Sequence, residues 1–303
     1  MGIDLKDFVL YCKSYSKDFL RLKLLLQSIE QYNVEQIPFY ISTPSSERGL
    51  LEEVLGKQGY IWIADEDIVS ANPGSSLEQY RAMPGGLSQQ IIKAEFWRLS
   101  LSENYLCIDS DSKFIHSFQY SDFINDDNVP YTVLHQNKEL FQMADNRSHP
   151  KVERDLRVEA ERVKALFGRS GPNFYGAPSP FNWSMKVWKS LDQEYLQLQG
   201  MTIWDLITPE FPESVIYCEA LLKYRAIPLI AIEPLFRAYH YDWQYFLMKR
   251  LGETTEKIAR NYLGVIYQSA WDIDNQIGHS NKSLPSRLLR RLKRFGRYLQ
   301  SYI

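Results

Sequence analysis

Two aspartates separated by one serine, Asp109 and Asp111, follow an apolar stretch in the sequence NYLCIDSDSKF. Side chains two positions apart in extended backbone point the same way, and around a turn both carboxylates can converge on one cation. Such oxygen ligands suit Mg²⁺ or Mn²⁺, which take one or two protein carboxylates and fill their other positions with substrate phosphates and water. The alternative is a polar turn in which Asp and Ser bond to nearby backbone.

The residues just before the aspartates favour the chemical interpretation. Residues 104–108 (NYLCI) suit a strand that is buried on both faces, which is typical of a central strand in an α/β sheet. Side chains just past the carboxyl end of such a strand face the crevice where these folds bind ligands. The two carboxylates are therefore expected in a binding crevice.

The first half of the chain alternates strands with helices, which predicts a mainly parallel sheet with right-handed crossovers. Apolar runs predict strands at 7–14, 38–42 and 60–64, and helical spacing predicts helices at 16–32, 47–58 and 88–101. Later the pattern loosens, with helical segments expected at 144–170 and 213–226 and a short strand at 228–233. The chain contains neither G-x-G-x-x-G nor G-x-x-x-x-G-K-[ST], so neither a dinucleotide fold nor a P-loop is supported.

Composition limits the class of protein. The chain has 303 residues, of which 45% are hydrophobic and 14% aromatic, enough for one large domain with a sizeable core or for one domain with an appendage. Three widely spaced cysteines, Cys12, Cys107 and Cys218, form no C-x-x-C pair, which favours a reducing compartment without a zinc site or disulfides. The first residues are acidic and no apolar run approaches the ~18 residues of a membrane span, so we expect a cytoplasmic protein.

These features together resemble the GT-A class of nucleotide-sugar glycosyltransferases. The resemblance rests on the first strand FVLYCKSY, the helix SQQIIKAEFWRL and the D-x-D about a hundred residues in, and it covers residues 7–241. It implies a Rossmann-like, mainly parallel sheet flanked by helices, with a catalytic domain at 1–245 (donor half 1–135, acceptor half 136–245) and a C-terminal helical segment at 246–303. It is nearest to bacterial enzymes that build capsule or lipopolysaccharide.

In that class the two carboxylates hold a divalent cation that bridges the diphosphate of the donor. By matching the motif, Asp109 and Asp111 inherit the binding of Mn²⁺ or Mg²⁺, and Ser110 lies with them in the donor site. The departing nucleoside diphosphate is doubly charged, so a divalent cation and nearby cations stabilise the developing charge. Lys93 and Gln89 share a helix face before this strand, which makes Lys93 a candidate phosphate contact and Gln89 a candidate sugar contact. A solvated lysine is the alternative.

The resemblance also places the nucleotide base at the end of the first strand. Tyr11 or Tyr15 could stack on the base with Lys13 nearby, although core packing explains Tyr11 equally well. Asp65, with Asp67, follows the third strand and could hold the base or ribose, or could simply be solvated.

A third metal ligand and a catalytic base are expected late in the chain. His240 is the preferred ligand and His279 the alternative, because imidazole suits Mn²⁺ adequately. An inverting transfer needs a base for the proton of the acceptor hydroxyl. Glu219 is preferred because apolar neighbours favour a partly buried carboxyl with a raised pKa, and Glu213 is the alternative.

Two further residues and the C-terminal tail complete the predicted surfaces. Asn182 and Trp183 could line the sugar or acceptor pocket, although Trp183 could equally be core. Seven of the 35 Lys and Arg residues lie in residues 275–303, which contain no Asp or Glu. Residues 284–303 predict a basic amphipathic helix that lies on an anionic membrane surface. The alternative is a helix docked on the domain, and binding to nucleic acid is not expected.

The sequence thus predicts a metal-dependent glycosyltransferase on the inner face of the membrane. It would move a sugar from a nucleotide-sugar, with UDP-sugar favoured, to a glycan or lipid-linked acceptor in bacterial surface polysaccharide synthesis, with inversion slightly favoured. The alternatives are a metal-dependent nucleotidyltransferase or phosphohydrolase, and a non-catalytic protein that binds nucleotide-sugars or membrane surfaces. If binding of nucleotide-sugars requires Mn²⁺, the protein is one of the two enzymes. In a non-catalytic protein the aspartates would form only a polar turn, and binding would not require Mn²⁺.

Overall fold

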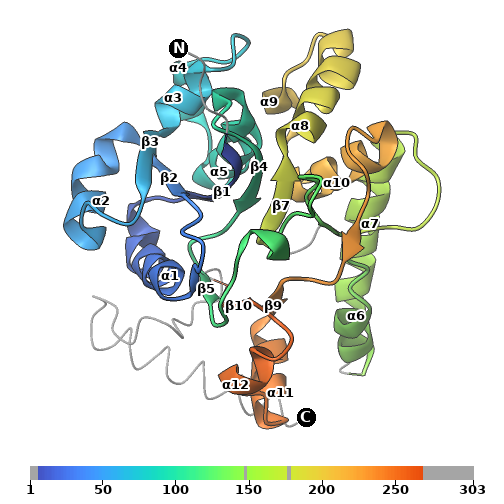
Figure 1. Cartoon of the computed structure of the whole chain (residues 1–303). Coiled ribbons are helices and arrows are strands. Elements are labelled where there is room, and N and C mark those ends of the chain that lie inside the picture. The colour runs from blue at the N-terminus through green and yellow to red at the C-terminus, as the bar shows by residue number, and fades with distance from the viewer. Residues whose placement is uncertain (1–5, 147–148, 176–178, 269–303) are drawn as a thin grey trace, which may run out of the picture.

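A five-stranded sheet forms the centre of the molecule. The computed structural model describes residues 6–146, 149–175 and 179–268 (Figure 1). The strand order is β3 (Ile61–Ala64), β2 (Phe39–Thr43), β1 (Lys6–Lys13), β4 (Ser102–Cys107) and β7 (Phe181–Ser184). The first four strands are parallel, and β7 runs antiparallel to β4. The predicted mainly parallel α/β sheet is therefore confirmed.

Side chains of β1 alternate between two cores, which explains why this strand is apolar throughout. Phe8, Leu10 and Cys12 face a core shared with α1 (Phe19–Tyr32) and α2 (Arg48–Leu55). Val9 and Tyr11 face the opposite core. That second core is closed by α3 (Asp65–Ser70), α5 (Gly85–Glu95), α8 (Met185–Leu191), α9 (Ile203–Leu206) and α10 (Glu213–Tyr224). Because each face is covered, both faces of a parallel strand must be apolar.

A second, three-stranded sheet continues directly from the aspartate motif. Its order is β5 (Ser112–Phe114), β10 (Gly264–Ile266) and β9 (Phe236–Ala238). β10 runs antiparallel to β5 and parallel to β9. A Cβ atom added to Gly264 would lie 2.2 Å from the ring of Phe236, so the strand accepts only glycine there without moving that ring. Late residues of the chain therefore support the segment that follows Asp111.

The remaining elements surround these two sheets. The strands β6 (Thr132–Val133) and β8 (Ala231–Ile232) form a small parallel pair. The other helices are α4 (Leu77–Ala82), α6 (Lys138–Asp145), α7 (Pro150–Leu166), α11 (Asp242–Arg250) and α12 (Thr255–Ile258). Figure 1 shows α7 beside α10, α6 at the lower end of α7, and α11 and α12 beyond β9.

Several predicted boundaries need correction. The strand expected at 228–233 pairs only over Ala231–Ile232, where proline, which lacks an amide N–H, stands at both 228 and 234. The helix expected at 88–101 is α5 followed by a 3-10 turn over Phe96–Leu99, and the segment at 144–170 contains the end of α6 and all of α7. The predicted tail helix at 284–303 lies outside the described residues. Among the described helices, none has the length and hydropathy needed to cross a membrane.

Candidate functional site

The two aspartates lie in a tight turn at the carboxyl end of β4. The backbone N–H of Ser112 donates to the carbonyl of Asp109 (3.0 Å), which closes a four-residue turn between β4 and β5. The N–H of Asp109 donates to Ser179 Oγ (2.8 Å), and the carbonyl of Asp111 accepts from the N–H of Tyr267 (3.0 Å). The polar-turn interpretation is thus correct for the backbone, and the Asp109 side chain, which is 29% exposed, faces solvent in part.

Lys93 connects the aspartate motif to the start of α10. Its ammonium group makes an ion pair with Asp109 Oδ1 and lies 3.7 Å from Glu213 Oε1. The side chain of Lys93 is only 4% exposed, whereas that of Asp109 is 29% exposed. The alternative of a solvated lysine is therefore wrong. The cluster opens to solvent on the Asp109 side, where a charged ligand can reach it.

The electrostatics of this cluster keep the lysine charged and make the buried glutamate easier to protonate. Burial lowers the pKa of Lys93, but the Asp109 and Glu213 carboxylates outweigh burial and raise that pKa above its ordinary value. Burial raises the pKa of Glu213, and Lys93 opposes this only in part. The result is a permanent cation at Lys93 beside a buried carboxyl group, Glu213, whose pKa is raised.

The catalytic base preferred from the sequence, Glu219, does not lie in this cluster. Both of its carboxylate oxygens are bound by Arg169, with Nε 2.5 Å from Oε2 and Nη2 2.7 Å from Oε1. Its side chain has no solvent exposure, so it joins the loop after α7 to α10 and cannot meet an acceptor. The alternative, Glu213, is the residue beside Lys93. The sequence did not predict a contact between Glu213 and Gln90. The backbone N–H of Glu213 donates to Gln90 Oε1 (3.4 Å), whereas the predicted sugar contact was the neighbouring residue Gln89, whose side chain is half-buried.

Most of the residues predicted to bind the nucleotide base are buried. Tyr11 is fully buried, its ring stacks on Phe96 with centroids 3.8 Å apart, and its hydroxyl lies 2.9 Å from Ser42 Oγ. Tyr11 is therefore a core residue with no ring face left for a base. Tyr15 is 38% exposed at the end of the same strand and stays a candidate for stacking.

Lys13 and Asp65 bind each other. Lys13 Nζ lies 2.8 Å from Asp65 Oδ2, the Tyr80 hydroxyl donates to that same oxygen (2.7 Å), and Asp65 has no exposed surface. Burial raises the pKa of Asp65, and the Lys13 charge opposes this shift. Contrary to the prediction that Asp65 is solvated or reaches the ribose directly, it anchors Lys13. Asp67 is exposed on α3.

The predicted pocket residues Asn182 and Trp183 belong to the interior. The Asn182 amide donates to the carbonyls of Phe123 (2.6 Å) and Tyr131 (3.0 Å). The ring of Trp183 is buried and packs edge-on against Trp188, with centroids 5.1 Å apart. Both residues hold β7 in place, and both also line a small cavity of about 30 Å³ that includes Ser214, the neighbour of Glu213.

A divalent cation fits the aspartate pair only in part. Asp109 and Asp111 offer oxygen ligands in one turn, and Asp109 is accessible. In the part of the chain that the structure describes, no three His, Cys, Asp or Glu side chains come together as a metal-binding group. His240 therefore does not join the two aspartates here, and His279 lies outside the described residues. Two carboxylates suffice for Mg²⁺ or Mn²⁺ when substrate phosphates supply other ligands.

Comparison with solved structures places this architecture in a known class. A crystal structure of an active-site mutant of LgtC superposes with a TM-score of 0.53 at 12% identity, over 94% of each chain. The apo form of mouse xyloside xylosyltransferase 1 matches with a TM-score of 0.44 at 9% identity, over 86% of this chain and 98% of that one. The first likeness concerns the fold, and the mainly parallel sheet flanked by helices is the GT-A fold.

The sequence itself identifies the family. The chain belongs to a family of unknown function, DUF6492, whose profile matches residues 7–205. No curated protein sequence matches the chain significantly. The family match includes the aspartate turn and Lys93 but ends before Glu213, so the second carboxylate of the cluster lies beyond it.

Proposed function

We propose that this protein is a metal-dependent glycosyltransferase that moves a sugar from a nucleotide-sugar to a glycan or lipid-linked acceptor. The observation that carries the proposal is the cluster of Asp109, Lys93 and Glu213 at the carboxyl end of a central strand in a GT-A fold. In open α/β sheets this edge is where ligands bind. A UDP-sugar is the favoured donor from the sequence resemblance.

Asp109 and Asp111 are the residues that would hold Mn²⁺ or Mg²⁺. When bound, the cation would stabilise negative charge on the departing diphosphate. Lys93 adds a charge that does not depend on pH near neutrality, because its two carboxylate neighbours raise its pKa. Since Lys93 is held by α5 and buried, little reorganisation is needed when charge develops nearby, which is the condition under which such groups are most effective.

Glu213 is the residue that we assign to the acceptor proton. Burial raises its pKa, which improves its ability to accept a proton from a hydroxyl group. Its position as the first residue of α10, next to Lys93, fixes the carboxylate relative to the aspartate turn. In an inverting transfer, which the sequence slightly favours, Glu213 would take the proton as the sugar arrives.

Thermal unfolding with nucleotide-sugars tests the proposal directly. UDP-, GDP-, CMP- and dTDP-sugars would each be added with and without Mn²⁺. A ligand that binds only the native state, at ~100 times its dissociation constant, adds roughly 2.7 kcal/mol of stability, which is easily measured. At least one donor should raise the unfolding temperature only with Mn²⁺, and Asp109→Asn should remove that shift.

The thermal shift, together with an assay of the products formed from the donor that binds, separates the alternatives. No shift with any donor contradicts the proposal. A shift followed by release of pyrophosphate or inorganic phosphate, without sugar transfer, indicates a nucleotidyltransferase or phosphohydrolase. A shift without any turnover indicates a non-catalytic nucleotide-sugar binding protein.

The cellular setting is a finer part of the proposal. The basic tail at 284–303 would hold the enzyme on the cytoplasmic face of an anionic membrane, next to lipid-linked acceptors of bacterial capsule or lipopolysaccharide synthesis. Full-length protein should sediment with anionic liposomes and be released as salt rises, because screening weakens surface attraction. A chain ending at residue 283 should stay in the supernatant. Equal sedimentation of both chains would contradict the membrane assignment.

A further inference from the structure

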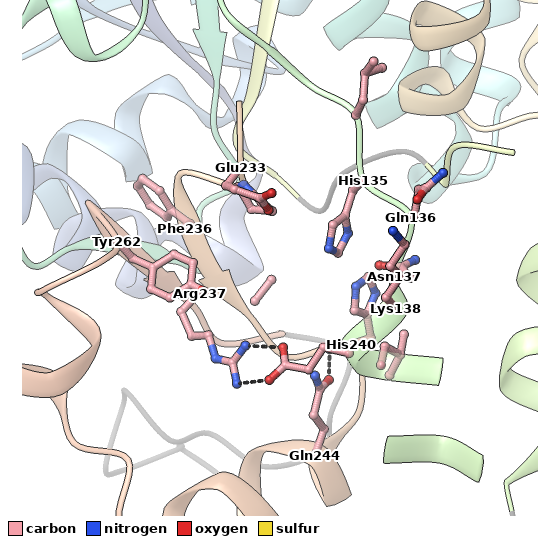
Figure 2. Close-up of a pocket in the computed structure, with 15 residues that line it drawn as sticks. His135, Gln136, Asn137, Lys138, Glu233, Phe236, Arg237, His240, Gln244 and Tyr262 are labelled. Carbon is pink, nitrogen blue, oxygen red and sulfur yellow. Dashed lines mark hydrogen bonds and ion pairs between the residues drawn. The ribbon is translucent and has the colours of Figure 1, made fainter. Parts of the chain in front are cut away.

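A cavity of about 270 Å³ lies along β9, and its lining includes none of the residues of the aspartate cluster (Figure 2). It extends from the segment before α6 across β9 to the start of α11. Figure 2 shows His135 and His240 on one side, with Glu233, Arg237 and Tyr262 opposite. Its volume is at the small end of ligand pockets, which suits a single sugar ring better than a whole nucleotide-sugar.

The sheet register fixes the position of this cavity relative to the aspartates. Ala238 lines the cavity and is level with Ile266 on β10, which is level with Ser112 on β5. Asp111 immediately precedes Ser112, so it lies at the same end of the sheet as the carboxyl end of β9. With neighbouring strands ≈ 4.8 Å apart, the cavity begins roughly 10 Å from the aspartate turn. A glycan chain that extends from the reacting sugar at the aspartate turn could span this distance and reach the cavity.

The charges that line the cavity balance, which disfavours an ionic ligand. Lys138 and Arg237 are positive, and Glu139 and Glu233 are negative. The guanidinium of Arg237 is bound by Glu139, with Nη1 2.6 Å from Oε2 and Nη2 3.1 Å from Oε1, and its Nε lies 3.0 Å from Glu253 Oε1. An arginine held on both sides by carboxylates is not available to a phosphate group.

The remaining polar groups can bind neutral hydroxyl groups. Burial lowers the pKa of His135, and it lowers that of His240 to about 4, so both imidazoles are neutral at neutral pH. A neutral imidazole has one donor and one acceptor nitrogen, and a sugar hydroxyl can serve either. The ring of Tyr262, which is half-buried, adds apolar surface for the C–H face of a sugar.

Two buried atoms in the cavity wall have no hydrogen-bond partner of ordinary geometry. They are His135 Nδ1 and Asn137 Oδ1, which lie two residues apart. Unsatisfied buried polar atoms are costly and uncommon in native proteins. Asn137 also has a left-handed backbone with φ of 51°, a conformation that asparagine adopts more readily than most residues. The two side chains also interact with each other, and this interaction partly opposes the effect of burial on the pKa of His135. They form a polar pair in the cavity wall whose hydrogen bonds are not all made.

We propose that this cavity binds one uncharged sugar residue of the acceptor glycan, through His135, Asn137 and the aromatic surface of Tyr262. The role of the bound sugar as part of an acceptor rests on the proposed glycosyltransferase function. The binding of a neutral sugar rests only on the residues that line the cavity. The site would select the acceptor at a residue beyond the one that receives the new bond.

Saturation-transfer difference NMR on the full chain tests the site. The probes are methyl glycosides of glucose, galactose and N-acetylglucosamine, with inorganic phosphate as the anionic comparison. Saturation transfer to at least one glycoside is expected. His135→Ala should weaken its binding about fivefold, the loss of one hydrogen bond. Ala238→Phe should abolish binding by filling the cavity, while His116→Ala, which removes an exposed histidine elsewhere, should leave binding unchanged.

Three outcomes would overturn the inference. These are no saturation transfer from any glycoside to the wild-type protein, unchanged transfer in both His135→Ala and Ala238→Phe, and displacement of a bound glycoside by inorganic phosphate. The nucleotide-sugar experiment is separate. Glycoside binding without any donor-induced thermal shift would retain the cavity as a sugar site and reject the transferase, and the reverse result would reject the cavity alone.

Discussion

Two lysine–aspartate pairs lie at the carboxyl edge of the same sheet, and they differ in access to solvent. Lys13, the last residue of β1, meets Asp65, whose side chain has no exposure and also accepts from Tyr80. Lys93 meets Asp109, whose side chain is 29% exposed, and Lys93 has Glu213 as a second carboxylate neighbour. The residue types are the same in both pairs. Access therefore separates a pair that supports the fold from one that can meet a ligand.

Breaking the sealed pair should give the largest effect. Lys13→Met leaves Asp65 as an uncompensated buried charge, which costs about 3–5 kcal/mol of stability. Urea unfolding measures this loss. The double variant Lys13→Met/Asp65→Leu should recover most of it, because two apolar side chains no longer require pairing. A loss below about 1 kcal/mol, the range of exposed ion pairs, would mean that the pair is not sealed in solution.

Changing the open pair should affect activity instead of stability. Asp109→Asn keeps the size of the side chain and an oxygen for Lys93, so the unfolding midpoint should change little. Sugar transfer should fall about 10³-fold, because the variant loses a carboxylate ligand of the cation that would stabilise the developing negative charge. The measurement is the rate of transfer at saturating donor and Mn²⁺. Full Mn²⁺-dependent activity in this variant would reject the metal assignment.

The two glutamates of α10 give a matched comparison. Glu213→Gln should lower turnover about a hundredfold with little change in donor affinity, the result expected when a general base is removed. Glu219→Gln breaks the paired hydrogen bonds with Arg169 and should lower stability, with turnover per folded molecule retained. If Glu219→Gln alone reduces turnover, the base is Glu219 and the ion pair with Arg169 must open during the reaction.

The smallest expected effect is the change of stability with pH that arises from His240. This residue is a buried neutral group, in contrast to the two buried ion pairs. Burial lowers the pKa of His240 to about 4. The unfolded chain therefore binds more protons than the native chain below the ordinary histidine pKa, and stability falls as the pH decreases. Between pH 7.5 and 5 the loss from this residue is about 2 kcal/mol. Urea unfolding at both pH values should show this loss in the wild type and a smaller one in His240→Gln. An equal loss in both proteins would place His240 in solvent.

The parts of the fold that follow from local pattern could be predicted from the sequence. The apolar run of β4 indicated a strand covered on both faces, and the aspartates after it indicated the edge of a sheet. Lys93 could be placed near them because it lies on the preceding helix. In each case the informative residues are neighbours in sequence or belong to one repeating element.

The errors arise where a distant partner decides the role of a residue. Glu213 and Glu219 lie on the same helix, and sequence spacing cannot show that Arg169, 50 residues earlier, closes on Glu219. Nor does it show that Lys93, 120 residues earlier, reaches Glu213. The strand pattern of β1 likewise does not tell whether its last aromatic ring, Tyr11, ends under Phe96 or in the crevice.

The order of synthesis gives the pairing of β5 with β10 a consequence for biogenesis. A ribosome makes the aspartate turn long before it makes Gly264–Ile266, the strand that pairs with β5. Until then β5 has an unpaired edge, and the N–H of Tyr267 is not there to hold the carbonyl of Asp111. Contacts between such distant segments form late in folding. Nascent chains arrested before residue 264 should therefore contain a folded central sheet in which the aspartate turn is not yet fixed. Donor binding should begin only when β10 has left the exit tunnel of the ribosome.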